Sequence, residues 1–121
     1  MNDIRPKTII CDIDGTLIIH TNPCNIAKNQ NTAILLEGTE EKLKEWDKKG
    51  YNIILLTGRK ESLRKVTEEQ LSNVGIFYDQ LIMGVGGGKR YLINDRKTHS
   101  DEDYAIAINI ERNKGIKNLE I

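Results

Sequence analysis

The sequence lacks the features that mark membrane proteins and secreted, disulfide-linked proteins. No apolar run approaches the roughly 20 residues of a membrane-spanning helix, and the first residues, MNDIRPKTII, contain no long apolar segment of the signal-peptide kind. The two cysteines, Cys11 and Cys24, form neither a disulfide framework nor a zinc-binding spacing. Cys11 lies inside an apolar run and is expected to be a small core residue. We therefore expect a cytoplasmic protein without membrane contact.

An excess of positive charge is also missing. The chain has 18 acidic and 18 basic residues, which are interspersed and give a net charge of zero. Proteins that bind nucleic acids usually carry a basic excess or a basic stripe, so the composition disfavours a nucleic-acid partner. The length of 121 residues allows one hydrophobic core and no second one. Residues 1–121 are thus expected to form a single domain.

Short apolar runs alternate with amphipathic segments along the chain. The segment 39–49 is a predicted helix with Thr39 as its N-cap and Gly50 at its end. A second helix is predicted where Leu63, Val66, Leu71 and Val74 share one face and Gly75 ends the segment. Near-continuous apolar strands between such helices are typical of an α/β fold with a mainly parallel sheet and helices on both faces. Five strands are predicted, at 7–12, 51–58, 78–84, 90–95 and 104–111.

The segment 18–38 fits neither pattern. It has polar asparagines and glutamines between two apolar ends, and Asn22-Pro23 is a turn signal. Both a β-hairpin flap with its bend near Asn22-Pro23 and an irregular loop agree with this composition.

Polar side chains gather at the predicted carboxyl ends of the strands, where open parallel sheets bind their ligands. Asp12 ends the first strand and Asp14 lies in the turn beyond it, Thr57 follows the second strand, and Asp95 ends the fourth. Carboxylates that meet at one edge need a cation, and an all-oxygen ligand set suits Mg²⁺ better than zinc. The hydroxyl of Thr57 and the backbone amides around Gly15 and Gly58 are expected to donate hydrogen bonds to phosphate oxygens. The pattern predicts a phosphoryl-transfer site.

Three motifs in this order resemble the haloacid dehalogenase (HAD) superfamily. DIDGT at 12–16 resembles its first motif, LLTGR at 55–59 its second and LINDR at 92–96 its fourth, so the resemblance extends over residues 7 to about 111. It implies a Rossmann-like HAD fold. It also implies a phosphoric monoester hydrolase in which Asp12 attacks phosphorus and Asp14 protonates the leaving oxygen, then activates water. The implied magnesium ligands are Asp12, the main-chain oxygen of Asp14, and Asp95.

The match departs from the family pattern in its fourth motif. A second acid usually accompanies the first one, but here Asn94 takes the adjacent place and the next acid is Asp101. Asn94 is either a plain strand-end residue or an outer ligand, and Asp101 is expected in a solvated acidic turn.

The HAD superfamily has a third motif, whose lysine steadies the nucleophile and the phosphate. Two residues of this chain are candidates for that role. Lys89 is the lysine nearest to the expected position, yet six residues of strand would hold it roughly 20 Å from the catalytic edge. The glycines of GVGGG (84–88) would have to bend the chain back for Lys89 to bind phosphate. Arg59 is the alternative source of charge; it either orients the substrate or faces water at the helix start.

The intervals between the first and second motifs and between the second and third are too short for the inserted cap domain that many members of the superfamily carry. It is therefore similar to small capless phosphatases of capsule and lipopolysaccharide sugar synthesis, which implies a small phosphorylated substrate such as a sugar phosphate. Capless members also act on macromolecules or close their sites with another subunit, so we expect a homo-oligomer with the 18–38 segment near the contact.

Three alternatives stay open. One is a HAD-like binding module without turnover, and another is a nucleic-acid 3′-phosphatase, which the neutral charge disfavours. A response-regulator receiver domain would need an aspartate at the end of its third strand, whereas Asp79 lies at the beginning of the third strand predicted here.

Overall fold

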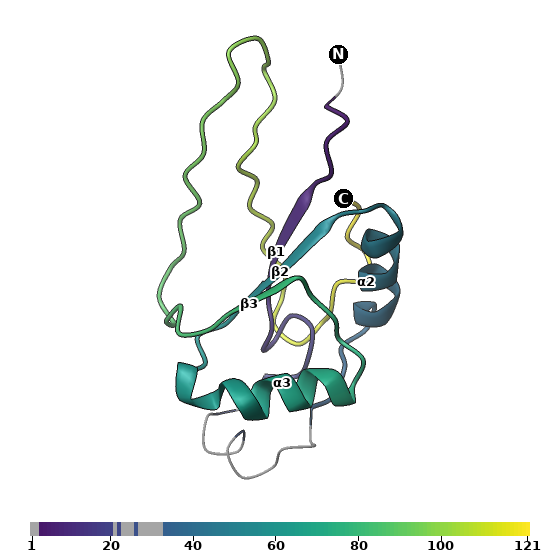
Figure 1. The fold of residues 1–121 in the computed structure, drawn as a ribbon, viewed down its shortest axis with the longest axis vertical. Coiled ribbons are helices and arrows are strands. Elements are labelled where there is room, and N and C mark those ends of the chain that lie inside the picture. The colour runs from purple at the N-terminus through teal and green to yellow at the C-terminus, as the bar shows by residue number, and fades with distance from the viewer. Residues whose placement is uncertain (1–2, 21, 23–25, 27–32) are drawn as a thin grey trace.

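The computed structural model describes residues 3–20, 22, 26 and 33–121. Within these ranges the chain forms a parallel sheet of three strands in the order β1-β2-β3, namely β1 (Thr8–Asp12), β2 (Asn52–Leu56) and β3 (Gln80–Ile82) (Figure 1). Cys11 pairs with Leu55 in the sheet register, and Leu55 pairs with Leu81 on the other side. The first three predicted strands and their parallel arrangement are thus confirmed.

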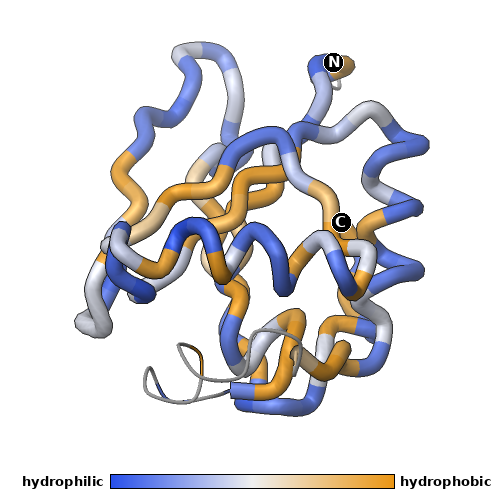
Figure 2. The backbone as a smooth tube through the Cα atoms, turned by 60° about the horizontal axis from the view of Figure 1, so that its bottom comes forward, coloured by the Kyte–Doolittle hydropathy of each residue, from blue (hydrophilic) through white to orange (hydrophobic). Residues whose placement is uncertain are grey.

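The strands form because their side chains alternate between the core and the surface. Ile9 and Cys11 of β1 are buried, as are Ile53 and Leu55 of β2, while the residues between them are more exposed. Figure 2 shows the apolar residues gathered along the central strands. Burial of each large aliphatic side chain contributes about 1.5–3 kcal/mol to folding. The sheet therefore holds the loops that follow the carboxyl ends of its strands in fixed positions.

Helix α2 (Thr39–Lys48) packs on the sheet through Leu43 and Trp46, both fully buried. The predicted N-cap is wrong by one residue: Gly38, at a left-handed φ of 89°, precedes the helix and no side chain caps it. The hydroxyl of Thr39 instead donates to the main-chain oxygen of Leu17 at 2.8 Å. Thr39 therefore ties the helix start to the loop that follows β1.

A single 3-10 turn, η1 (Glu61–Leu63), leads into helix α3 (Arg64–Asn73). The buried residues of α3 are Leu71 and two polar ones, Thr67 and Gln70. Two buried polar side chains one turn apart require hydrogen-bonding partners. Their common partner is the side chain of Arg59, which donates to both.

Residues 86–111, called the arm from here on, extend away from the sheet as a long excursion (Figure 1) without helix or strand. The predicted strands at 90–95 and 104–111 are therefore wrong for this structure, and a five-stranded sheet is not confirmed. The reason is geometric. Gly84 and Gly86 adopt left-handed φ values of 70° and 86°, a backbone conformation of turns and not of strands, and no residue of the arm that follows them joins the three-stranded sheet. Most large apolar side chains of the arm are exposed, whereas Ile110 packs partly buried against the core. The exposed ones are Tyr91, Leu92, Ile93, Ile106 and Ile108.

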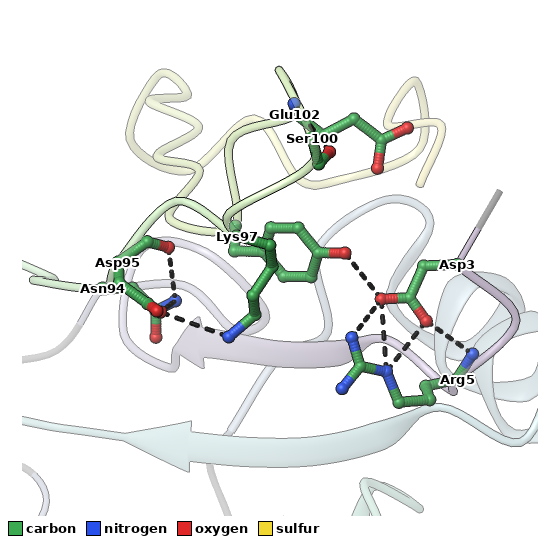
Figure 3. Close-up of polar contacts among 8 residues, drawn as sticks. Asp3, Arg5, Asn94, Asp95, Lys97, Ser100 and Glu102 are labelled. Carbon is green, nitrogen blue, oxygen red and sulfur yellow. Dashed lines mark hydrogen bonds and ion pairs between the residues drawn. The ribbon is translucent and has the colours of Figure 1, made fainter. Parts of the chain in front are cut away.

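The arm contacts the N-terminal residues through a small polar cluster (Figure 3). The hydroxyl of Tyr104 donates to Asp3 at 2.7 Å, and the Arg5 guanidinium forms a fork with the same carboxylate. Arg5 first, and Tyr104 second, hold the pKa of Asp3 well below its usual range. Exposed ion pairs of this kind contribute little to stability, so the cluster is a weak attachment for the arm.

The two ends of the 18–38 segment run antiparallel, since Ile19 donates to Ile34 at 3.0 Å and Leu36 donates to Leu17 at 2.9 Å. These contacts agree with a hairpin. The predicted bend at Asn22-Pro23 lies largely outside the described residues, so the flap and the absence of a cap stay predictions.

Helices α2 and α3 have ten residues each. Neither they nor any other helix in the described part of the chain is long and apolar enough to cross a bilayer.

Candidate active site

Asp12 occupies the last position of β1 and faces the carboxyl edge of the sheet. Its side chain is 37% exposed. The Thr16 hydroxyl lies 3.4 Å from Oδ2, and the Arg90 guanidinium lies 3.3 Å from Oδ1. A carboxylate that is half-open to solvent and only loosely held can be approached by a ligand from outside.

Asp14, two residues on, is in a different environment. Both of its oxygens accept hydrogen bonds from the Arg59 fork, Oδ2 from Nε at 2.9 Å and Oδ1 from Nη2 at 2.7 Å. The two side chains are only 14% and 4% exposed. Bidentate pairs fix both position and orientation, so Asp14 is immobilised while its neighbour Asp12 is accessible.

Arg59 is itself held by helix α3. Its Nη1 donates to Thr67 Oγ1 at 3.0 Å and to Gln70 Oε1 at 2.8 Å. These bonds explain the two buried polar residues of α3. Arg59 therefore points inward to Asp14 rather than outward to solvent, and a direct contact with substrate stays a prediction that this geometry does not favour.

Thr57 and Gly58 lie beside this pair, just after β2. Thr57 is buried, and its Oγ1 accepts a hydrogen bond from the Arg59 amide at 3.1 Å, which leaves the hydroxyl proton to donate elsewhere. A Cβ at position 58 would lie 3.1 Å from the Gly86 oxygen, so a larger residue would fit only if the neighbouring backbone moved slightly. The Gly58 amide has no acceptor within the described ranges. Thr57 and Gly58 are thus placed to donate to an anion.

The turn around Gly15 is already satisfied internally. Gly15 has a φ of 85°, and its amide donates to the Ile18 oxygen at 2.7 Å. In this conformation the Gly15 amide is not available to a phosphate, and its predicted role stays untested.

The fourth-motif residues lie on the arm, away from Asp12. Asp95 is exposed and accepts from Lys97 at 3.2 Å and from the neighbouring Asn94 side chain at 3.3 Å (Figure 3). Asp101 is also exposed. Over the described residues, no group of three His, Cys, Asp or Glu side chains is close enough to hold a metal ion. The predicted ligand set is therefore not brought together here.

Arg90, rather than Lys89, is the arm cation that reaches the catalytic edge. Besides its contact with Asp12, it donates to the Gly86 oxygen at 3.1 Å. Lys89 is exposed and has no partner within the described chain. The assignment of Lys89 to phosphate binding stays a prediction.

Comparison with known proteins identifies the family. The family model for the phosphatase domain of polynucleotide kinase PNKP matches residues 6–110. The chain belongs to this family. The PNKP phosphatase domain is a HAD-type domain, so the predicted HAD resemblance and the α/β fold with a parallel sheet are confirmed, as is the assignment to the phosphatases of this superfamily. No curated protein matches the sequence.

Solved structures agree with the assignment to the PNKP phosphatase family. A chain in a structure of a Pnkp1/Rnl/Hen1 complex has 35% identity and a TM-score of 0.58 over 71% of the present chain. A second structure, of the Pnkp1/Rnl/Hen1 RNA repair complex, has 32% identity and a TM-score of 0.56 over 82%. The matched parts are 30% and 28% of those chains, so the present chain spans less than a third of their length. A crystal structure from Vibrio cholerae, at 21% identity and a TM-score of 0.52, covers 76% of this chain and 82% of its own and shows the fold alone.

The oxygen donors of this phosphatase domain at the sheet edge fit Mg²⁺ in kind. The Asp12 carboxylate is accessible, and the main-chain oxygen of Asp14 has no hydrogen-bond donor among the described residues. Hard oxygen donors of this type are the ligands that Mg²⁺ prefers. A third protein ligand would have to come from elsewhere in the domain.

Cys11 lies directly before Asp12 in the phosphatase domain, on the buried side of β1. Burial, and to a lesser degree the Asp12 charge, raises the pKa of this thiol to about 12. The thiol is therefore neutral at physiological pH, which agrees with the predicted core role rather than a nucleophilic one.

Sequence reasoning missed Thr67, Gln70 and Arg90 as parts of this phosphatase site. A signal existed for the first two, since polar residues at i and i+3 lie beside Leu71 on the helix face that packs inward. Arg90 gave no signal beyond its place next to Lys89.

Proposed function

We propose that the chain is a magnesium-dependent phosphomonoester hydrolase that removes a terminal phosphate from a polynucleotide through an aspartyl-phosphate. The observation that carries this proposal is the difference in environment between two carboxylates that lie two residues apart. Asp12 is accessible to solvent, whereas Asp14 is held in an ion pair by the buried Arg59. Covalent catalysis needs a nucleophile that can reach the substrate and an acid that is held in place. The two environments match these two roles.

In the first step, an Asp12 oxygen attacks phosphorus and the bond from phosphorus to the leaving oxygen breaks. Because both Asp14 oxygens accept from Arg59 in this structure, one of these bonds has to be released before Asp14 can carry a proton on that oxygen; Asp14 then transfers the proton to the leaving group while its other oxygen keeps a bond from Arg59. In the second step, water attacks phosphorus and gives a proton to Asp14, the bond from phosphorus to the Asp12 oxygen breaks, and inorganic phosphate leaves. Both carboxyl groups are thereby restored. Thr57 and the Gly58 amide donate to the non-bridging phosphate oxygens.

Mg²⁺, when bound, would offset the charges of the Asp12 carboxylate and the phosphate. We propose that it is held by Asp12, the main-chain oxygen of Asp14, and Asp95. Asp95 can take part only if the arm moves toward β1. The exposed apolar residues of the arm give a reason for such a movement, since their burial against the sheet would be favourable.

The substrate proposal departs from the sequence-based preference for a sugar phosphate. The family model and the two structures from Pnkp1 complexes, one of them an RNA repair complex, support a nucleic-acid end instead. The balanced net charge is compatible with this, because a terminal phosphate needs only local donors. A small sugar phosphate stays the second candidate, favoured by the absence of an overall basic excess.

The deciding experiment compares three substrates at equal concentration: an RNA oligonucleotide with a 3′-phosphate, a sugar phosphate and a chromogenic aryl phosphate. We expect phosphate release that requires Mg²⁺, stops with EDTA and is at least tenfold faster on the oligonucleotide. Faster release from the sugar phosphate would establish the second candidate. No release from any of the three, with the oligonucleotide still bound, would establish a binding module without turnover.

Asp95 is tested against a matched arm residue. Asp95→Asn should raise the Mg²⁺ concentration needed for half-maximal turnover by about tenfold or more, while Asp101→Asn should leave it unchanged. Both carboxylates are exposed, so neither change should affect folding. The opposite outcome would transfer the ligand role to Asp101.

We also propose that the protein is cytoplasmic and that a second subunit covers the open edge, because phosphoryl transfer benefits from a site that excludes water. Light scattering should then show a dimer or larger. A fully active monomer would contradict the oligomer.

A further inference from the structure

The segment 112–117 packs beside the turn that follows β1. It lies beyond residues 6–110, the part of the chain that matches the family model. Ile116 is buried in the core, and its amide donates to the Glu37 oxygen at 3.0 Å. Gly115 packs so closely that a Cβ there would collide with the Glu37 carbonyl group. Lys117 pairs with the Glu37 side chain at 3.0 Å. The segment 112–117 is thus firmly attached to the body of the domain.

Within that segment, Asn113 holds both ends of the turn at 15–20. Its amide donates to the Gly15 oxygen at 2.8 Å, and its side-chain Oδ1 accepts from the His20 amide at 2.9 Å. Asn113 has a φ of 63° and is, over the described residues, the only non-glycine in the left-handed region. Asparagine adopts that conformation more easily than other side chains. The backbone geometry and the two bonds therefore depend on one another.

This turn adjoins the nucleophile and contains one of the groups that contact it. Asp14 precedes Gly15 directly, and the Thr16 hydroxyl lies against Asp12. The amides of Thr16 and Leu17 donate to the Ile13 oxygen, at 3.1 and 2.9 Å, and fix the turn from within. Asn113, which lies outside the turn, holds it through the bonds to Gly15 and His20.

We propose that Asn113 is a positioning residue of the phosphatase site, which clamps the Gly15–His20 turn and so keeps Asp14 and Thr16 in register with Asp12. This inference rests on the proposed function for its effect on turnover, but not for the clamp itself. When a reacting group is displaced by a fraction of an ångström, the rate of the chemical step decreases. Loss of the clamp should thus lower kcat and leave KM nearly unchanged.

Two substitutions at the same position separate the side-chain bond from the backbone. Asn113→Gly keeps the left-handed conformation and the bond to Gly15, but removes the acceptor for His20. Asn113→Asp keeps an acceptor oxygen at the same place. Lys117→Ala is the matched control, because it weakens the attachment of the same segment without touching the turn.

The first measurement is hydrogen exchange at the His20 amide. In Asn113→Gly we expect about tenfold faster exchange, which corresponds to the loss of one hydrogen bond, and wild-type rates in Asn113→Asp and Lys117→Ala. The second is steady-state hydrolysis with Mg²⁺. There, Asn113→Gly should lose about tenfold in kcat with KM changed less than twofold, and Asn113→Asp should restore most of it.

An unchanged His20 exchange rate in Asn113→Gly would overturn the clamp. Faster exchange with an unchanged kcat, or an equal loss of kcat in Lys117→Ala, would overturn the positioning role. If the wild-type protein hydrolyses no phosphate, the proposed function fails separately. The exchange rate then decides the clamp alone, in favour if it rises and against if it does not.

Discussion

Strand β2 and the arm segment 90–95 both carry a run of large apolar residues, but only the run in β2 is packed inside the protein. Both contain consecutive large apolar residues, yet Leu55 is fully buried and Ile93 is 92% exposed. The difference lies in their neighbours. Strand β2 pairs with a strand on each side and packs against α2, whereas the arm leaves the sheet at a pair of left-handed glycines. An apolar run supplies the driving force for burial, but a partner surface decides whether burial occurs.

The same division separates the parts of the candidate site. Asp12, Asp14, Thr57 and Arg59 belong to the packed body, whereas Asp95 belongs to the arm. The body therefore fixes the groups proposed for the covalent chemistry, and the arm carries a group whose contribution depends on its position. Substitutions in the two regions should differ accordingly.

The largest effect is expected for the nucleophile in the body. Asp12→Asn should reduce phosphate release more than about a thousandfold, because the amide cannot attack phosphorus. Circular dichroism should show an unchanged fold. Asp47→Asn, an exposed carboxylate on α2, is the control and should keep full activity. Near-normal turnover in Asp12→Asn would mean that another group is the nucleophile.

A large loss of stability is expected when the buried ion pair is broken. Arg59→Ala should lower the free energy of unfolding by about 3–5 kcal/mol, because Asp14 stays buried without its counter-charge and the bonds from Arg59 to Thr67 and Gln70 are lost. Lys44→Ala removes an exposed cation whose partner, Glu40, lies on the same helix α2, and should cost about 1 kcal/mol or less. Urea denaturation measures both, and equal losses would contradict the structural role of Arg59.

The contrast between body and arm is tested most directly by two leucines. Leu55→Ala should cost about 2–5 kcal/mol of unfolding free energy because it leaves a cavity. Leu92→Ala, on the exposed arm, should change it by no more than about 0.5 kcal/mol. This expectation holds for the Mg²⁺-free protein with the arm exposed as in this structure. With Mg²⁺ bound, the movement proposed for Asp95 should bury Leu92, so that Leu92→Ala then costs more than about 1 kcal/mol, and no such loss would contradict the movement.

The smallest effect concerns Cys11. Its pKa is raised to about 12 in the folded protein from an ordinary value near 9, so between these values the folded state keeps a proton that the unfolded state loses. The stability contributed by the neutral thiol is therefore complete below about pH 9 and decreases as pH rises toward 12. The unfolding free energy of wild type minus that of Cys11→Ala should fall by about 1 kcal/mol between pH 8 and pH 10. A difference independent of pH would contradict the burial of this thiol.

Sequence patterns predicted the body well because its signals are local. The alternation in β1 and β2, the apolar face of α2 and the DIDGT motif at the end of β1 each depend on neighbouring residues. The pairing of Arg59 with Asp14 joins positions 45 residues apart, and no short-range pattern encodes it. The arm was predicted as strands from its apolar run at 90–95 and its alternation at 104–111, but strand formation depends on a hydrogen-bonding partner that such local patterns do not specify. Asn113 was missed for a similar reason, since its left-handed backbone and its two contacts exist only in the folded chain.

The single tryptophan of the chain, Trp46, is fully buried on α2, and its indole N–H has no hydrogen-bond partner among the described residues. An indole shielded from water and from polar partners emits at short wavelength, and its emission shifts to the red when the core opens. The arm contains no tryptophan but has Tyr91 and Tyr104. Selective excitation at the red edge of the absorption band should therefore follow the unfolding of the body alone, even while the arm changes its position.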